Sequence, residues 1–154
     1  MDAVPEESLA DGTPAFTHSE AEQTFERVSA YVDTVDPQTI GGLWWHDRRR
    51  LVVGVSFTTD VERHRDALTR LVGAESVVVS AAEFAEVELQ AVADRIGDDM
   101  KPGGLVNFVS VNEEAGLVEV GVASLNDDIR AAVHARWPHP AVTVIGMGPF
   151  FTAR

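Results

Sequence analysis

The heptapeptide LVVGVSF, residues 51–57, decides the fold, because it returns later in the chain as LVEVGVA, residues 117–123. Both copies contain a Val-Gly-Val triplet, Val53–Val55 in the first and Val120–Val122 in the second. Short apolar runs rich in β-branched residues are typical of buried strands, and a pattern that recurs at a wide spacing indicates a duplicated structural unit. The sequence therefore predicts two similar units, each built around one of these strands.

The residues on either side of the heptapeptides repeat as well. Another apolar strand and a polar turn precede each copy, with the turns at residues 47–50 and 112–116, which predicts a hairpin. A helix follows each copy, with Asp60 or Asn126 at the N-cap, and a short strand closes each unit at residues 76–80 or 141–147. The predicted unit is strand, strand, helix, strand, used twice.

Two further helices are expected outside these units. Ser19 and Glu22 have the spacing of a capping box, and the apolar residues that follow recur at helical intervals, which predicts a helix from Ser19 to Val32. Ser80 and Glu83 form a second capping box before a helix that we expect to end at Gly97. The predicted fold class is α+β, with two tandem β-β-α-β repeats joined by a helix and an additional N-terminal helix.

This organisation divides the chain into six segments. They are a mobile acidic arm (1–16), the N-terminal helix and linker (17–40), the first repeat (41–80), the connecting helix and turn (81–104), the second repeat (105–147) and a C-terminal tail (148–154).

Composition narrows the classes of function. The 154 residues include 25 acidic against 12 basic side chains, a formal net charge of -13, and no cysteine. This charge repels phosphate backbones and anionic lipid, so we expect neither nucleic-acid nor membrane binding. No apolar run approaches the length of about 20 residues that a spanning helix needs. The N-terminus lacks the regions of a signal peptide, which predicts a cytoplasmic protein as written, although a secreted protein trimmed of its signal would look the same.

The stretch GGLWWHDRRR, residues 41–50, presents two adjacent tryptophans next to the first turn. A two-residue turn at Arg48 and Arg49 would pair Trp44 with Val53 and place Trp44 in the core. Trp45 would then lie on the outer face of the sheet with Leu43 and Val52. A shift of one residue in the register would exchange the two tryptophans.

The second repeat extends this hypothesis. There the valines at 109, 111, 118, 120 and 122 are predicted to point inward and Phe108 outward beside Gly121. We expect an outer surface that binds a protein partner or a second copy of the chain, formed by Leu43, Trp45, Val52 and Phe108. The alternative is that the N-terminal helix folds back and covers this face with Phe25, Val28 and Val32.

Catalytic and metal-binding patterns are weak. His46 and Asp47 are neighbours on a strand, so their side chains point to opposite faces. No nucleophile or paired carboxylates accompany the histidines, and acidic doublets such as Asp127–Asp128 are explained by helix capping. No catalytic residue, cofactor or metal site is predicted.

The run from Gly41 to Val55, the joining helix with Leu89 and the second VEVGV resemble the strand-strand-helix-strand modules in propeptides of alpha-lytic-type bacterial serine proteases. The resemblance covers roughly residues 41–147. It implies a protein that assists the folding of a protease and inhibits it. The C-terminal tail of this protein, here GPFFTAR with Phe150 and Phe151, would enter the substrate cleft of the protease. A signal peptide and a following protease domain, which the family has, do not occur in this sequence.

We therefore expect a non-catalytic protein-binding module that uses these two phenylalanines together with the outer sheet surface. A propeptide-like folding aid or protease inhibitor is the form that the resemblance implies. The alternative is a small enzyme or ligand-binding protein that uses a groove between the two repeats.

Overall fold

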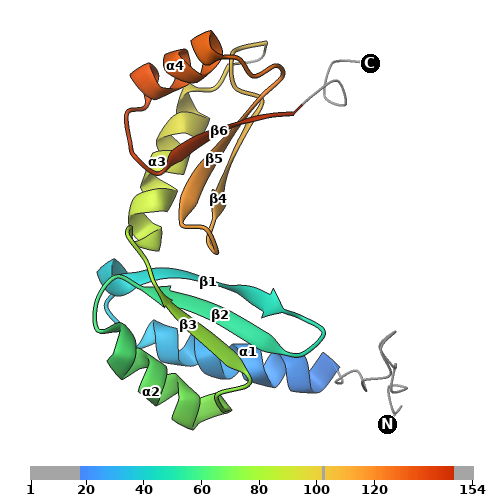
Figure 1. The fold of residues 1–154 in the computed structure, drawn as a ribbon, viewed down its shortest axis with the longest axis vertical. Helices are drawn as coiled ribbons and strands as arrows, with labels where there is room; N and C mark the ends of the chain where they lie inside the picture. Colours follow the sequence, from blue (N-terminus) through green and yellow to red (C-terminus); the bar gives the residue numbers. More distant parts are fainter. Residues whose placement is uncertain (1–17, 102, 148–154) are drawn as a thin grey trace. The chain divides into compact units, whose positions relative to one another are not determined.

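The computed structural model describes residues 18–101 and 103–147, and Figure 1 shows their helices and strands. The chain divides into unit 1, residues 1–85, and unit 2, residues 86–154. Each unit contains one three-stranded sheet, and the order of elements in both is helix, strand, strand, helix, strand. The predicted α+β class with an internal duplication is confirmed.

Unit 1 places two helices on the same side of its sheet (Figure 1). Its elements are α1 (His18–Asp33), a short 3-10 helix (Pro37–Thr39), β1 (Ile40–Asp47), β2 (Val52–Phe57), α2 (Val61–Val72) and β3 (Val77–Ala81). β2 is the central strand, antiparallel to β1 and parallel to β3. The core between helices and sheet includes Val28, Val32, Val53, Val55, Phe57 and Leu68.

The register of the first hairpin differs from the prediction by one residue. Trp45, and not Trp44, pairs with Val53, because the ladder is irregular between Trp45 and Asp47 and the loop spans residues 48–51. The Asp47 carboxylate holds this loop by accepting hydrogen bonds from the backbone N–H groups of Arg49 (3.1 Å) and Arg50 (3.2 Å). Since side chains alternate along a strand, the one-residue shift exchanges the faces of the two tryptophans.

Leu43 and Trp45 consequently lie on the helix-covered face. Both pack against the core, and the Trp45 ring lies 5.1 Å from that of Phe25 in α1. The prediction that Leu43 and Trp45 face outward is wrong. The alternative is not met either, because α1 packs with Phe25, Val28 and Val32 on the core side of the sheet, where α2 also lies, and not on the face that carries Val52. Trp44 lies instead on the outer face, against Gly54, where a Cβ atom would come within 2.2 Å of the indole.

Unit 2 repeats this arrangement with the register that the sequence predicts. Its elements are α3 (Glu86–Asp99), β4 (Phe108–Asn112), β5 (Leu117–Val122), α4 (Asp127–Arg136) and β6 (Val142–Gly146). Phe108 pairs with Gly121, and Val109 pairs with Val120. A Cβ atom on Gly121 would come within 2.1 Å of the Phe108 ring. Phe108 on Gly121 is therefore the counterpart of Trp44 on Gly54.

The helix that the sequence places between the repeats is the first helix of unit 2, where α3 packs against β4 and β5. Its predicted boundaries are wrong. Ser80 pairs with Ser56 within the β2–β3 ladder, so it cannot cap a helix, and α3 begins at Glu86. Gly97 does not end the helix, which continues to Asp99.

The N-caps of α2 and α4, the helices that follow the two central strands, differ from each other. The Asn126 side chain accepts a hydrogen bond of 2.8 Å from the Ile129 N–H, as predicted. Asp60 also occupies an N-cap position, but its backbone is left-handed (φ 54°) and its side chain makes no capping hydrogen bond.

Across residues 18–101 and 103–147, no helix is both long and apolar enough to span a bilayer.

Candidate functional site

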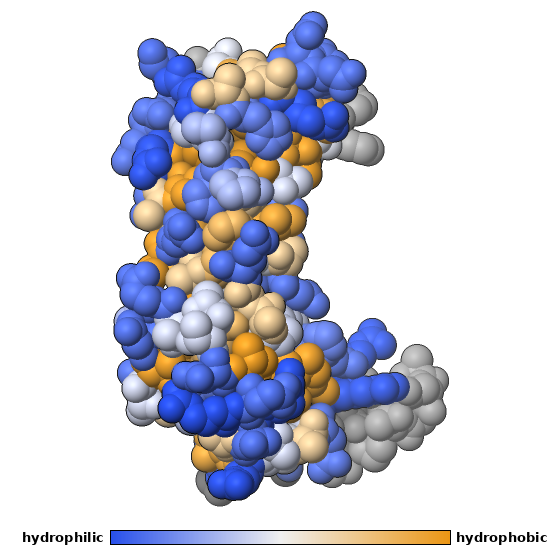
Figure 2. Space-filling model, turned by 60° about the vertical axis from the view of Figure 1, so that its left-hand side comes forward, coloured by the Kyte–Doolittle hydropathy of each residue, from blue (hydrophilic) through white to orange (hydrophobic). Residues whose placement is uncertain are grey.

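The predicted partner-binding residues of unit 1 lie on two different faces of its sheet. Leu43 and Trp45 lie under α1, whereas Val52 is on the opposite face of the same sheet and Phe108 is in unit 2. Phe150 and Phe151 lie outside the described residues. Figure 2 shows a face on which hydrophobic residues are interspersed with hydrophilic ones and do not form one broad apolar area.

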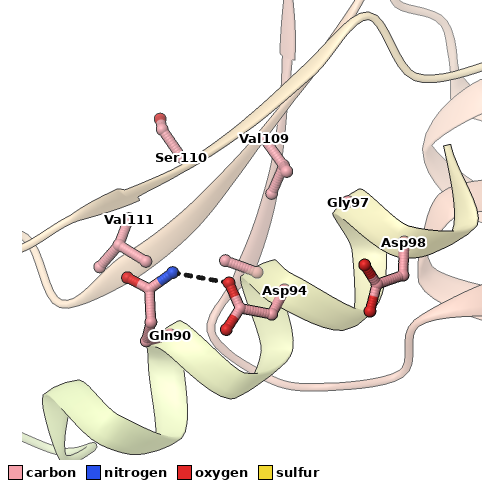
Figure 3. A pocket seen from close by; sticks show the side chains of 8 residues that line it. Gln90, Asp94, Gly97, Asp98, Val109, Ser110 and Val111 are labelled. Carbon is pink, nitrogen blue, oxygen red and sulfur yellow. Dashed lines mark hydrogen bonds between the residues drawn. The ribbon is translucent and has the colours of Figure 1, made fainter.

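Unit 2 instead contains a groove between α3 and β4 with a volume of about 430 Å³ (Figure 3). We call it the α3–β4 groove. Its walls come from one helix and one strand, and its lining residues are Gln90, Ala93, Asp94, Gly97 and Asp98 from α3, and Val109, Ser110 and Val111 from β4.

The helical wall of the groove is acidic and polar. Gln90, Asp94 and Asp98 follow one another at intervals of four residues, which places them in one stripe along α3. Gln90 Nε2 donates a hydrogen bond of 2.9 Å to Asp94 Oδ1. Gly97 widens the groove, since a Cβ atom there would find its nearest neighbour, Val109 Cγ1, at 3.9 Å.

The strand wall of the groove is apolar and lies at the edge of the sheet. The strand order is β4-β5-β6, so no strand of the described ranges 18–101 and 103–147 pairs with one side of the β4 backbone in this sheet. Val109 and Val111 point toward α3, while Ser110 between them points away (Figure 3). The ladder between β4 and β5 continues without irregularity from Phe108 to Asn112. A regular edge strand is a template for pairing with another chain.

The equivalent space in unit 1 is filled. Trp45 and Val109 occupy the same position in the two repeats, because each pairs with the first valine of a Val-Gly-Val triplet. In unit 1, Trp45 packs against Phe25 from the preceding helix. In unit 2 the smaller valine leaves the groove beside the helix.

The edges of the sheet in unit 1 are also less suited to pairing. The ladder of β1 shifts register twice, and irregularities of this kind bend an edge strand and disrupt its pairing. On β3, Arg65 Nη2 donates a hydrogen bond of 2.8 Å to the carbonyl oxygen of Val79. In β4, both the regular ladder and the adjoining groove favour an incoming strand.

A histidine that the sequence left unassigned lies in the core of unit 1. His64 is 3% exposed, its ring stacks on Phe57 at 4.0 Å, and its Nδ1 lies 2.7 Å from the Tyr31 hydroxyl oxygen. Burial lowers the pKa of His64, the positive charge of Arg63 lowers it further, and the carboxylate of Asp60 acts in the opposite direction. The neutral imidazole thus serves as an interior packing group, and its position four residues before the buried Leu68 is the sequence signal for this role.

The α3–β4 groove combines polar and apolar side chains. Two carboxylates and an amide on α3 face a pair of valines on β4, which suits hydrogen bonding, ion pairing and apolar contact. Within the described ranges, no group of three or more His, Cys, Asp or Glu side chains is placed to hold a metal ion. Comparison of the sequence with protein-family models and with curated proteins gave no match.

Proposed function

We propose that this protein is a non-catalytic protein-binding module, and that unit 2 binds an extended segment of its partner in the α3–β4 groove. The observation that carries this proposal is the regular edge strand β4 next to an open groove. Main-chain hydrogen bonds to an edge strand provide affinity, and the side chains that enter a neighbouring groove provide specificity.

The dimensions of the two walls support this mode of binding. The five residues of β4 extend over about 17 Å at the usual strand rise. The stripe from Gln90 to Asp98 extends over about 12 Å at the usual helical rise. An extended segment of four or five residues therefore matches both walls, with alternate side chains directed toward α3.

A propeptide-like folding aid or protease inhibitor is one specific form of this function. It rests on the sequence resemblance, and β4 belongs to the second of the two modules that carry that resemblance. Inhibition of a bacterial serine protease of the alpha-lytic type by the full chain would be its direct measurement.

The general proposal is tested by selecting extended peptides from a random library against the full chain. Val109→Trp should block the groove with the side chain that unit 1 has at the same position. Val78→Trp is the matched control, since Val78 is a strand valine of unit 1 that is 38% exposed. We expect the selected peptides to bind the wild type and Val78→Trp alike, and to bind Val109→Trp at least about tenfold more weakly.

Peptides methylated on alternate backbone nitrogens provide the second part of the test. Methylation removes the N–H donors that strand pairing requires, so one of the two alternating patterns should abolish binding. Failure to select any peptide, or selected peptides whose binding is indifferent to Val109→Trp, would reject the proposal.

A further inference from the structure

We infer that the segment bound in the α3–β4 groove is basic, with lysine or arginine at two positions separated by one residue. This inference rests on the proposed function and adds the chemical class of the partner. It follows from the charge of the groove, the spacing of its carboxylates and the position of its two valines.

The charge of the groove is negative. Its lining contains the carboxylates of Asp94 and Asp98 and no basic side chain. Both residues are exposed, and they belong to a chain with a formal net charge of -13. An acidic segment would meet like charge both at the groove and on approach, whereas a basic segment is attracted at both stages.

The spacing of the carboxylates matches an extended chain. Asp94 and Asp98 are four residues apart on a helix, which separates them by about 6 Å along its axis. Side chains on the same face of a strand are two residues apart, or about 6.6 Å. Two cationic side chains at positions i and i+2 of the bound segment can therefore each face one carboxylate.

The valines select long side chains with apolar stems. Val109 and Val111 lie on the strand wall, half-buried, on the face directed toward α3. A side chain on the same face of an added strand would pass over these valines before it reaches the helical wall. Lysine and arginine combine an aliphatic stem with a charged end, so one side chain can satisfy both walls.

The test uses three labelled peptides of equal length in which threonine alternates with lysine, glutamine or glutamate. Their affinities for the full chain are measured by fluorescence anisotropy at low and at physiological salt. The lysine peptide should bind about tenfold more tightly than the glutamine peptide at low salt, and the difference should shrink as salt screens the ion pairs. The glutamate peptide should bind most weakly.

Asp94→Asn with Asp98→Asn is the decisive variant, because asparagine retains the shape and a hydrogen-bonding oxygen while the charge is lost. Glu26→Gln with Asp66→Asn is the matched control, since it removes the same charge from exposed helix positions in unit 1. We expect the first double variant to lose most of the preference for lysine over glutamine and the control to keep it.

The possible failures are distinguishable. Equal affinity for the lysine and glutamine peptides, with binding still blocked by Val109→Trp, would overturn the inference and leave the proposed function standing. Equal loss of preference in both double variants would also overturn it, because the selectivity would then come from the charge of the whole chain. Absence of binding by all three peptides and by every library peptide would reject the proposed function as well.

Discussion

Gly54 and Gly121 show how the lack of a side chain fixes the position of an aromatic ring on the next strand. The Trp44 ring lies on Gly54 and the Phe108 ring lies on Gly121. Each ring is so close that a Cβ atom on the glycine would clash with it. We expect Gly54→Ala to destabilise unit 1 by about 1–3 kcal/mol, because the new methyl group would displace the indole. Urea unfolding of the wild type and the variant measures this difference.

Trp44→Ala supplies the control for that substitution. Without the indole there is nothing for the methyl group to displace, so adding Gly54→Ala to Trp44→Ala should cost much less than it costs in the wild type. An equal cost in both backgrounds would show that the strain lies elsewhere in the strand.

We expect His64 to make the stability of unit 1 depend on pH. Burial and Arg63 lower its pKa below the ordinary value of 6.5 against the opposing effect of Asp60, while the Tyr31 hydroxyl and the Phe57 ring contact the imidazole itself. The unfolded chain therefore binds the proton more readily than the folded chain. The contribution of the neutral imidazole to stability should be complete above pH 6.5 and be lost as the pH falls from there through the lower, folded pKa.

Thermal unfolding of the wild type and of His64→Phe over this pH range tests the effect. The variant keeps an aromatic ring for Phe57 but has no group that titrates there, so its stability should decline less between neutral and mildly acidic pH. Parallel declines for the two proteins would assign the pH dependence to the carboxylates instead.

At the scale of single elements, the equivalent helices α2 and α4 differ in their N-terminal caps. Asn126 accepts a hydrogen bond from Ile129 N–H at the start of α4, while Asp60 makes no such bond at the start of α2. Asn126→Ala should destabilise unit 2 by about 1 kcal/mol, as measured by denaturant unfolding. Asn126→Ser retains an oxygen acceptor and should cost much less; an equal cost for serine and alanine would contradict the role of this hydrogen bond.

The elements were predictable from the sequence because they depend on local patterns. Residues 51–57 and 117–123 identify two central strands, and Asn126 identifies the start of α4. The first turn, the side-chain cap at Asp60 and the cap at Ser80 were not predicted correctly. The faces of Trp44 and Trp45 were not predictable in this way, because an irregularity of one residue beside Asp47 reverses them. The α3–β4 groove was not predicted because it depends on contacts between residues far apart in the sequence. It is open since the side chains that meet there, on α3 and on β4, are too small to fill the space between them.

At the scale of the whole molecule, the duplication separates what both units share from what distinguishes them. Both have a central Val-Gly-Val strand, a parallel and an antiparallel neighbour, and an aromatic ring on the glycine. They differ between the first helix and the edge strand, where unit 1 has Trp45 against Phe25 and unit 2 has Val109 beside an acidic helix. The filled space belongs to a core, whereas the open one is where we propose that a partner binds.

Reciprocal substitutions at the equivalent positions test this distinction. Trp45→Val should leave a cavity beside Phe25 and destabilise unit 1 by about 2–4 kcal/mol. Val109→Trp should change the stability of unit 2 by less than about 1 kcal/mol, because a groove of about 430 Å³ can receive the larger ring. Denaturant unfolding followed by hydrogen exchange assigns each change to its unit. If Val109→Trp costs as much as Trp45→Val, the space beside β4 is part of a packed core, and the unit that we propose as the binding unit has no room for a partner.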